Sequence, residues 1–248
     1  LFLKYLIIYI LIFTAIFYIS SKFSLTDNPN SRKLHKKKVF NTGGLILYFF
    51  LLTVIYLGEY NHNIELIISI GFFVALGGFV DDRIDLNPLS KISIILLPSI
   101  YLIFNGISIN NLGNYEYIGI LHLGKFEIPF LILAIGLFVN STNYIDGIDG
   151  LLLIFFISCM AYYIFIIDDP KIITLFGLIL IPAIINLILN MLPNSSKLKF
   201  FTGDAGSLFI GFFICFLTIE LYRTQNIHPT YLIWPLWYPV YDFLYVSI

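Results

Sequence analysis

The stretch FLILAIGLFVNSTNYIDGIDGLLLIFFISCMAYYIFII, residues 130–167, contains two apolar runs joined by a short polar segment. Each run approaches the length of about 20 residues that an α-helix needs to cross a lipid bilayer. The joining segment, NSTNYIDGIDG, holds two asparagines and two aspartates within residues 140–150. Such polar side chains are costly inside a membrane unless they face water or a ligand. The stretch therefore predicts two membrane-spanning helices with a polar junction at the membrane surface.

Apolar runs and short polar junctions alternate along the whole chain of 248 residues, which is 59% hydrophobic and 12% charged. The mean hydropathy is +0.91, far above that of soluble domains. A membrane β-barrel is excluded, because its strands are short segments of alternating polarity. We expect an all-α, polytopic transmembrane helical bundle that forms one domain over residues 1–248. Its nine expected spans lie near residues 2–21, 43–58, 64–80, 92–106, 129–145, 151–167, 172–190, 207–222 and 230–247.

Charge and cysteine content exclude some classes of function. The formal net charge of −1 provides no basic surface for nucleic acid. Cys159 and Cys215 form neither a CxxC pair nor a Cys/His cluster, so we expect two core residues. The chain begins at Leu1 and ends at Ile248 inside an apolar run, and we expect it to lack parts at both ends. The first apolar run has no signal-peptide cleavage site and counts as a span.

Basic residues orient the predicted spans. The polar loop at 22–42 carries six of them, so the positive-inside rule makes this loop cytoplasmic and the N-terminus external. Counting spans from there assigns ten Lys and Arg to the inside and four to the outside. The segment 114–128, which alternates around Gly124, predicts a small hairpin outside the bilayer. Eight aspartates fall on or near the cytoplasmic side: Asp27, Asp81, Asp82, Asp85, Asp146, Asp149, Asp204 and Asp242.

The segment GGFVDDRIDL, residues 77–86, places Asp81, Asp82 and Asp85 where the third span meets the cytoplasm. Adjacent carboxylates repel each other, and a divalent cation or a lysine offsets that repulsion best. The alternative is a set of solvated loop charges. DDRID also matches the DDxxD pattern with which prenyl-transferring enzymes hold Mg²⁺ against a diphosphate, so this segment alone leaves the chemistry open.

A second polar segment, NSTNYIDGIDGL at residues 140–151, follows the fifth predicted span. Asn140, Asn143 and Asp146 occur at intervals of three, close enough to helical periodicity to share one face. Asparagine amides bind a uracil edge or a phosphate, and glycines let the backbone approach a ligand. The alternative is a helix end with Asx turns, which explains one Asp-Gly pair better than two.

A third segment, FTGDAGS at residues 201–207, precedes the eighth predicted span. Gly203 and Gly206 free the backbone around Asp204, and we expect the next helix to begin near Ser207. The positive end of that helix then points to the same cytoplasmic surface and favours a phosphate. The alternative is that Asp204 or Ser207 is only a helix cap.

The basic segment NPNSRKLHKKK, residues 28–38, has two interpretations. It is typical of a topology anchor that is attracted to anionic lipid. Alternatively, Arg32, Lys33 and His35 hold a lipid phosphate at the depth of the headgroups. The sequence of this segment alone does not separate the two.

Taken in order, RKLH with TGG at 42–44, DDRIDL, NSTNYIDGIDGL and FTGDAGS resemble the polyprenyl-phosphate N-acetylhexosamine-1-phosphate transferases, glycosyltransferase family 4. This resemblance covers nearly the whole chain. It implies transfer of a sugar 1-phosphate from a UDP-N-acetylhexosamine to polyprenyl (undecaprenyl) phosphate, with release of UMP and use of Mg²⁺ or Mn²⁺. It also implies a multi-pass protein of the bacterial inner membrane with a cytoplasmic active site. Such enzymes initiate cell-envelope glycans such as lipopolysaccharide O-antigen or teichoic acid.

The resemblance and the chemistry of the residues together suggest roles within the site. We expect Asp204 to be the main metal ligand, with Asp146 or Asp81 assisting, and Asp82 to be the base or the group that orients the lipid phosphate. Lipid phosphate attacks directly, or an aspartyl-phosphate intermediate forms; the sequence leaves both open. The expected substrate contacts are Arg32, Lys33, His35, Lys91, Asn140, Asn143, Asp149, Gly203 and Ser207.

Departures from the family pattern leave alternatives open. Ala205 favours the N-acetylglucosamine branch, since the branch that transfers phospho-N-acetylmuramoyl-pentapeptide carries threonine there. Phe40 and Asn41 stand where relatives have proline before the Gly-Gly pair. The histidine-rich motif expected after the ninth span lies beyond Ile248, so we expect this chain to be inactive alone. Other hypotheses are an aspartate-rich membrane prenyltransferase, a cation-coupled transporter and a non-catalytic relative; a homodimer is left open.

Overall fold

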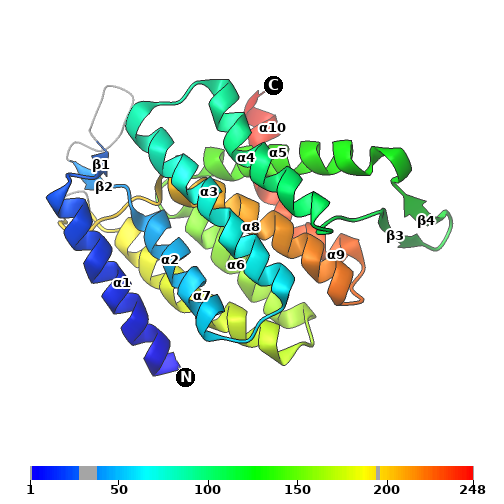
Figure 1. The fold of residues 1–248 in the computed structure, drawn as a ribbon, viewed down its shortest axis with the longest axis horizontal. Coiled ribbons are helices and arrows are strands. Elements are labelled where there is room, and N and C mark those ends of the chain that lie inside the picture. Colours follow the sequence, from blue (N-terminus) through cyan, green and yellow to red (C-terminus); the bar gives the residue numbers. More distant parts are fainter. Residues whose placement is uncertain (1, 28–37, 194–195, 248) are drawn as a thin grey trace.

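The apolar runs fold as α-helices, and the polar junctions between them gather at the two ends of an elongated bundle (Figure 1). The computed structural model describes residues 2–27, 38–193 and 196–247. Its helices are α1 (Phe2–Lys22), α2 (Gly43–Leu57), α3 (His62–Ile84), α4 (Pro88–Phe104), α5 (Glu127–Ile145), α6 (Leu151–Ile166), α7 (Pro170–Asn190), α8 (Gly203–Thr224), α9 (Pro229–Ile233) and α10 (Trp237–Ser247). Two strand pairs complete the fold: β1 (Thr26–Asp27) with β2 (Val39–Phe40), and β3 (Asn111–Tyr115) with β4 (Gly119–His122).

Capping side chains define the starts of three helices. Asn61 accepts a hydrogen bond from the backbone two residues on at the start of α3. Asn87 accepts from the backbone three residues on at the start of α4, Asp169 from the backbone two residues on at the start of α7, and a proline, Pro88 or Pro170, follows each of them. Such side chains satisfy free N–H groups of the first turn, while proline has no N–H to leave unpaired. Local sequence therefore fixes where these helices begin.

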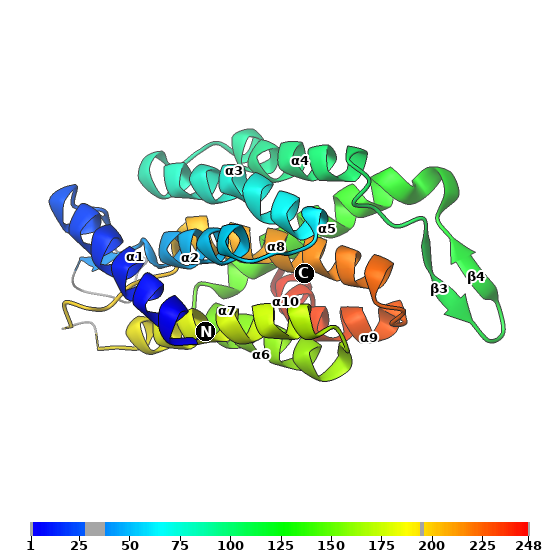
Figure 2. The ribbon, with the colours of Figure 1, turned by 60° about the horizontal axis from the view of Figure 1, so that its bottom comes forward.

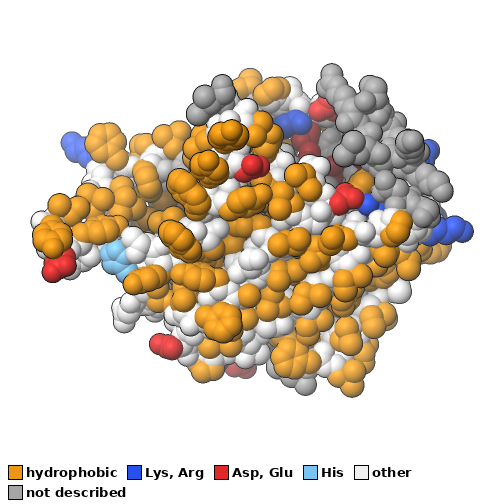
Figure 3. All heavy atoms as spheres, turned by 180° about the vertical axis from the view of Figure 1, so that it is seen from behind, with side chains coloured by type: hydrophobic (Ala, Val, Ile, Leu, Met, Phe, Trp, Pro, Cys, Tyr) orange, Lys and Arg blue, Asp and Glu red, His pale blue; other side chains and the backbone are white. Residues whose placement is uncertain are grey.

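The surface of the bundle suits a lipid environment. By length and composition, α1, α3, α5, α7 and α8 can each cross a membrane, whereas α2, α4 and α6 are shorter apolar helices. Hydrophobic side chains cover most of the face in Figure 3, and basic side chains lie near its rim. Exposed apolar side chains include Leu3, Phe73, Leu133 and Phe165, from four different helices. The helical membrane bundle is confirmed; nine spans and an external N-terminus stay predictions.

The last expected span, 230–247, is not one continuous helix. The structure divides this region into α9, a 3-10 turn at Trp234–Leu236 and α10. Pro235 lies at the start of that turn and Pro239 lies near the start of α10. Each proline lacks the N–H that a helix interior requires. The span at 230–247 stays a prediction, and a hydropathy count does not register the interruptions within it.

Helix α8 is the centre of the bundle and packs against α2, α3 and α5 (Figure 2). Its most apolar window of 18 residues is 94% buried, far more than in any other spanning helix of the described chain. Glycines permit the close approach: a Cβ at Gly44 of α2 would lie 2.1 Å from the Cα of Gly206, and one at Gly78 of α3 would lie 2.4 Å from the carbonyl oxygen of Asp204. Small residues give membrane helices this kind of contact.

The far end of α8 is held by a polar cluster. Glu220 is 1% exposed. Its carboxylate accepts hydrogen bonds from the amides of Asn61 and Asn63 at 2.9 and 3.0 Å, and Arg223 lies 3.0 Å away. A buried carboxylate needs such partners. The cluster fixes α8 against the start of α3, so both ends of this helix pair are held.

The predicted hairpin exists, but its turn lies earlier than expected. Strands β3 and β4 pair antiparallel and project from one end of the bundle (Figure 1). Their turn is at residues 116–118, whereas Gly124 begins a 3-10 turn, Gly124–Phe126, that leads into α5. Gly119 and Gly124 both have positive φ, which glycine adopts without strain. The alternation around Gly124 was therefore an entry into a helix, not a hairpin turn.

Candidate active site

A cleft of about 1120 Å³ opens at the end of the bundle opposite the β3–β4 hairpin. The end of α3, the start of α4, the turn after α5 and the segment before α8 surround it. Seven of its lining residues are aspartates and two are basic, which gives it a strongly acidic wall. The lining residues are Asp27, Asn41, Asp81, Asp82, Arg83, Ile84, Asp85, Lys91, Asp146, Gly147, Ile148, Asp149, Asn190, Phe201, Thr202, Gly203 and Asp204.

Asp81 joins α3 to α4. Helix α3 continues to Ile84, four residues past its expected end, so Asp81 lies in the last helical turn and is 6% exposed. One carboxylate oxygen accepts the backbone N–H of Leu86 at 2.8 Å, and the other lies 2.9 Å from Lys91 Nζ. Asp85, at φ +47°, ends the helix. Both oxygens of Asp81 are therefore engaged within the fold.

Asp82 holds the start of α8. Its Oδ2 accepts the backbone N–H of Asp204 at 3.1 Å, and the backbone N–H of Ala205 also interacts with the Asp82 carboxylate. These N–H groups are among the four that a helix leaves unpaired at its start. Gly203 makes room for the contact: its φ is +71°, and a Cβ there would lie 2.8 Å from Asp82 Oδ2. The cap of α8 therefore comes from α3, not from Asp204 or Ser207.

Asp204 lies in the first turn of α8, because the helix begins at Gly203 and not near Ser207. The side-chain amide of Asn143 donates to Asp204 Oδ1 at 2.9 Å and to the hydroxyl of Ser207 at 2.8 Å. Asn143 thus fixes the orientation of Asp204. Asn140 does not join them: its side chain is exposed, and its amide donates to the carbonyl of Gly136 on the same helix.

Asp146, at the end of α5, adds a further negative charge beside Asp204. Burial, followed by the charges of Asp204, Asp82 and Asp149, raises the pKa of Asp146 well above the usual range of an aspartate. Such a shift means that the ionised form is short of solvation and of positive partners. Asn143 and Asp146 therefore share the face that meets Asp204, as the sequence predicted.

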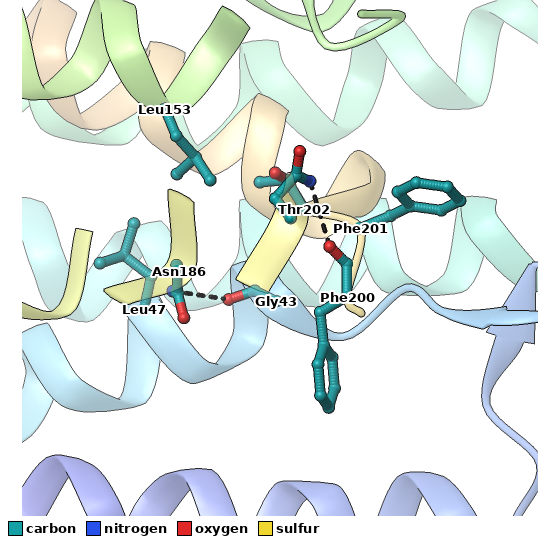
Figure 4. A pocket seen from close by; sticks show the side chains of 8 residues that line it. Gly43, Leu47, Leu153, Asn186, Phe200, Phe201 and Thr202 are labelled. Carbon is teal, nitrogen blue, oxygen red and sulfur yellow. Dashed lines mark hydrogen bonds between the residues drawn. The ribbon is translucent and has the colours of Figure 1, made fainter. Parts of the chain in front are cut away.

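A backbone contact brings TGG at 42–44 to the segment before α8. Gly43 and Gly44 donate their N–H groups to the carbonyls of Phe201 and Thr202 at 3.0 and 2.9 Å, and Phe201 donates to the carbonyl of Phe40 at 2.7 Å. Figure 4 shows the neighbouring contact, in which the amide of Asn186 points to the carbonyl of Gly43. A small cavity whose lining includes Gly43, Asn186 and Thr202 measures about 10 Å³, enough for about one water molecule.

Asn41 and Arg83 form a contact that the sequence did not predict. Arg83 donates to the side-chain oxygen of Asn41 at 2.7 Å, and its guanidinium lies over the ring of Phe79. Asn41 is 4% exposed. Of the two departures from the family pattern, Asn41 thus lies in the wall of the cleft, whereas Phe40 is not among its lining residues. The signal for Arg83 was present, since it is the basic residue inside DDRIDL.

The structure brings most of the expected site residues together. Asp81, Asp82, Asp146, Asp149, Asp204, Gly203 and Lys91 line the cleft, and behind its wall Asn143 donates to both Asp204 and Ser207. Lys91 is 41% exposed and lies between Asp81 and Asp85. The expected contacts at Arg32, Lys33 and His35 lie outside the described residues. Lys199 and Asn190 were missed as site residues; both are buried, and Asn190 lines the cleft whereas Lys199 lies behind its wall.

A divalent cation fits the chemistry of this cleft. Among the described residues, no three His, Cys, Asp or Glu side chains form a ready cluster that would hold a metal ion. Mg²⁺ does not need one, because it usually binds through one or two carboxylates, water and substrate phosphates. Asp82, Asp146 and Asp204 line the same cleft, and this crowding of like charges favours a cation between them. The carboxylates present therefore suit Mg²⁺ in the company of a phosphate substrate.

Comparison with known proteins agrees with the resemblance that the motifs indicate. Glycosyl transferase family 4 matches residues 64–222, more than half of the chain. The undecaprenyl-phosphate alpha-N-acetylglucosaminyl 1-phosphate transferase of Escherichia coli (strain K12) is 28% identical over 251 residues, which cover 95% of this chain and 68% of that protein. The transferase of the same name from Salmonella typhimurium is 30% identical with the same coverage.

A Gram-positive relative extends the comparison. The probable undecaprenyl-phosphate N-acetylglucosaminyl 1-phosphate transferase of Bacillus subtilis (strain 168) is 28% identical over 216 residues, 84% of this chain and 59% of that protein. All three relatives named here are N-acetylglucosaminyl 1-phosphate transferases. None of them is a pentapeptide transferase, a prenyltransferase or a transporter. The resemblance read from the four motifs is confirmed.

Proposed function

Because the chain belongs to glycosyl transferase family 4, we propose that it transfers N-acetylglucosamine 1-phosphate from UDP-N-acetylglucosamine to undecaprenyl phosphate. The observation that carries this proposal is the similarity over 95% of the chain to transferases that are named for this activity. The cleft supports it independently, since its acidic wall suits a phosphate bound together with a divalent cation, and its position at one end of a membrane bundle suits a substrate brought in by a lipid. The product would begin the synthesis of a cell-envelope glycan.

The reaction brings two anionic phosphates together. An oxygen of the lipid phosphate attacks the β-phosphorus of the UDP-sugar, the bond to the bridging oxygen breaks, and UMP leaves with that oxygen. Most catalysis of such transfers comes from positioning and electrostatic stabilisation. Lys91, half-exposed in the cleft, would contact a phosphate oxygen, and Asp82 would orient the lipid phosphate. We favour direct attack over an aspartyl-phosphate intermediate, because Asp82 already holds the start of α8.

The cofactor of this proposal is Mg²⁺, with Mn²⁺ as the alternative. Asp204 and Asp146 would hold it. When bound, the cation neutralises charge on the diphosphate and on the departing UMP. Asp81 would take part only by releasing Lys91 or Leu86, since both of its oxygens have partners. Asn143 keeps the Asp204 carboxylate in place, so no side chain has to reorganise for the cation.

We propose the cytoplasmic face of a bacterial plasma membrane for this cleft. The support is the distribution of basic residues. When the loop at 22–42 is placed inside, counting spans puts ten Lys and Arg on the inside and four on the outside, as the positive-inside rule requires. The N-terminus and the β3–β4 hairpin would then be external. A homodimer stays a prediction.

A panel of donors tests the proposed reaction. The assay uses the full-length protein that includes this chain, because this chain alone is expected to be inactive. It is purified and incubated with undecaprenyl phosphate, Mg²⁺ and one of UDP-N-acetylglucosamine, UDP-N-acetylgalactosamine, UDP-glucose or UDP-N-acetylmuramoyl-pentapeptide. We expect UMP release and a lipid product with UDP-N-acetylglucosamine at the highest rate. A clear preference for the pentapeptide donor would overturn the assignment to the N-acetylglucosamine branch.

A further inference from the structure

Lys199 is a buried cation beside the cleft. It lies in the segment before α8, its side chain is 3% exposed, and Nζ lies 2.6 Å from Asp149 Oδ2. The same ammonium lies 5.3 Å from the centre of the Phe201 ring. A lysine is rarely buried unless it is paired, because loss of hydration is costly. Lys199 is not among the residues that line the cleft, so within the described chain it faces Asp149 rather than the space a substrate would occupy.

Asp149 is the exposed member of the pair. Its side chain is 53% exposed and lines the cleft next to Asp146. A carboxylate offers acceptor sites on two oxygens, so one that binds Lys199 can still accept from an N–H or O–H of a ligand. Charge-assisted bonds of this kind are short and directional. The ion pair therefore fixes the direction in which Asp149 presents its remaining acceptor sites.

The turn that carries Asp149 does not depend on Lys199 for its shape. Gly150 has φ +78° and donates its N–H to the side-chain oxygen of Asn190 at 2.6 Å. The amide of Asn190 donates in turn to the carbonyl of Phe200 at 3.1 Å. These contacts fasten the backbone of the turn to the segment before α8. What Lys199 adds is the orientation of one carboxylate.

We infer that Lys199 is a positioning residue for the donor substrate, which acts by holding the carboxylate of Asp149 toward the UDP-sugar in the cleft. This inference rests on the proposed function for the identity of the donor. The ligand chemistry is an N–H or hydroxyl group that donates to a carboxylate; the UDP-sugar has such groups, whereas an ionised lipid phosphate offers only acceptors. Lys199 itself does not touch the substrate.

The two partners differ in what their removal does to the fold. Lys199→Met keeps an unbranched apolar side chain in the buried position and leaves Asp149 exposed to water. Asp149→Asn leaves a buried ammonium without its carboxylate, which is the more damaging change. We therefore expect the melting temperature of Lys199→Met to stay near that of the wild type and that of Asp149→Asn to fall. Lys199→Met is thus the informative variant.

Steady-state kinetics on the purified protein test the role of Lys199. Lys199→Met should raise the KM for UDP-N-acetylglucosamine about 10-fold, the scale of one weakened charge-assisted contact. The KM for undecaprenyl phosphate and kcat should stay unchanged, because the acceptor and the reacting phosphates do not meet Asp149. Lys197→Met, at an exposed lysine two residues away, is the matched control and should behave as the wild type.

A double-mutant cycle shows whether Lys199 acts through Asp149. If it does, Lys199→Met combined with Asp149→Asn should raise the donor KM no more than Asp149→Asn alone. Additive effects of the two changes would overturn the inference. So would a donor KM that does not respond to Lys199→Met, or an equal loss on both substrates together with a lowered melting temperature.

Binding of UMP separates this inference from the proposed reaction. Its Kd is measured on the same purified variants without acceptor lipid. If the wild type transfers no sugar phosphate but Lys199→Met weakens UMP binding, the positioning role stands and the proposed reaction fails. If transfer is normal and Lys199→Met alters neither the donor KM nor the Kd of UMP, the proposed reaction stands and the positioning role fails. A wild type that binds no UMP would overturn the inference.

Discussion

Asp204 is held from two directions by residues of two other helices. Asp82 of α3 accepts its backbone N–H, and Asn143 of α5 donates to its carboxylate. These contacts come from segments 122 and 61 residues away in the chain. A carboxylate fixed in this way is preorganised and does not reorient when charge develops during the reaction. Its place in the first turn of α8 follows from Gly203, whose positive φ lets the chain enter the helix beside Asp82.

Replacement of Asp204 by Asn removes one negative charge and keeps the size of the side chain. We expect kcat to fall at least about 100-fold, the usual effect of losing one preorganised electrostatic contact. The protein should still insert and melt near the wild-type temperature, because Asp82 binds the backbone and not the side chain. Asp168→Asn, at an exposed loop position, is the control. A near-normal kcat for Asp204→Asn would mean that the charge of Asp204 is not needed for catalysis.

The raised pKa of Asp146 predicts how pH and Mg²⁺ act together on stability. Because the folded pKa lies above the unfolded one, this group favours folding at low pH, and its contribution is lost as pH rises through the folded pKa. Mg²⁺ binds the ionised carboxylate and offsets that loss. Thermal melts at two pH values should therefore show a larger increase in Tm on adding Mg²⁺ at the higher pH than at the lower. An equal increase at both pH values would speak against Asp146 as a ligand.

Helices α2, α3 and α8 form the frame of the site through contacts between glycines and backbone. Gly44 faces Gly206, and Gly78 faces the carbonyl of Asp204, each too closely for a Cβ. Gly43 and Gly44 also donate their N–H groups to the segment before α8. Displacing α2 or α3 by the width of a methyl group would therefore move the carboxylates of the cleft relative to one another.

Gly44→Ala tests this frame, with Gly177→Ala as its control. The added Cβ at residue 44 would lie 2.1 Å from Gly206, whereas one at residue 177 meets nothing within 4 Å. We expect Gly44→Ala to destabilise the protein by about 1–3 kcal/mol, as overpacking does, and to lower kcat. Gly177→Ala should be neutral or slightly stabilising, since alanine favours a helix interior. Denaturation and turnover measured on both variants decide; equal stability of the two would refute the close α2–α8 contact.

Hydropathy predicted the helices well but their ends less well. The runs that became α1 to α8 were all found, because continuous apolar stretches require helices in lipid. The continuation of α3 to Ile84 and the start of α8 at Gly203 were missed. Both ends are stabilised by contacts between distant segments, such as Asp82 with the start of α8, and hydropathy along the chain carries no record of them. The same applies to Lys199, whose partner is 50 residues away.

At the scale of the whole molecule, the two ends of the bundle differ in chemistry. The acidic cleft and the β1–β2 pair lie at one end, and the β3–β4 hairpin lies at the other (Figure 1). The hairpin exposes Tyr117 and Ile118 at its turn, side chains typical of a membrane interface. The charges of the loops alone predicted that eight aspartates lie on or near the cytoplasmic side. The cleft brings seven of these eight together.

Accessibility of single cysteines tests the proposed orientation. The two native cysteines are buried, so they give little background. In intact cells, a membrane-impermeant thiol reagent should modify Tyr117→Cys at the hairpin turn and spare Asp85→Cys and Lys197→Cys. All three should react after the membrane is opened. Modification of position 85 or 197 from outside would invert the topology and remove the cleft from the cytoplasmic face.

The fate of the β-phosphate of UDP-N-acetylglucosamine tests the central claim most directly. The donor is labelled at that phosphorus and incubated with the protein and undecaprenyl phosphate. The account predicts that the label and the sugar enter the lipid product together, in equal amounts, and that UMP appears in the same amount. Release of labelled UDP, with sugar alone on the lipid, would mean that the protein transfers N-acetylglucosamine and not its 1-phosphate, and the account would be contradicted.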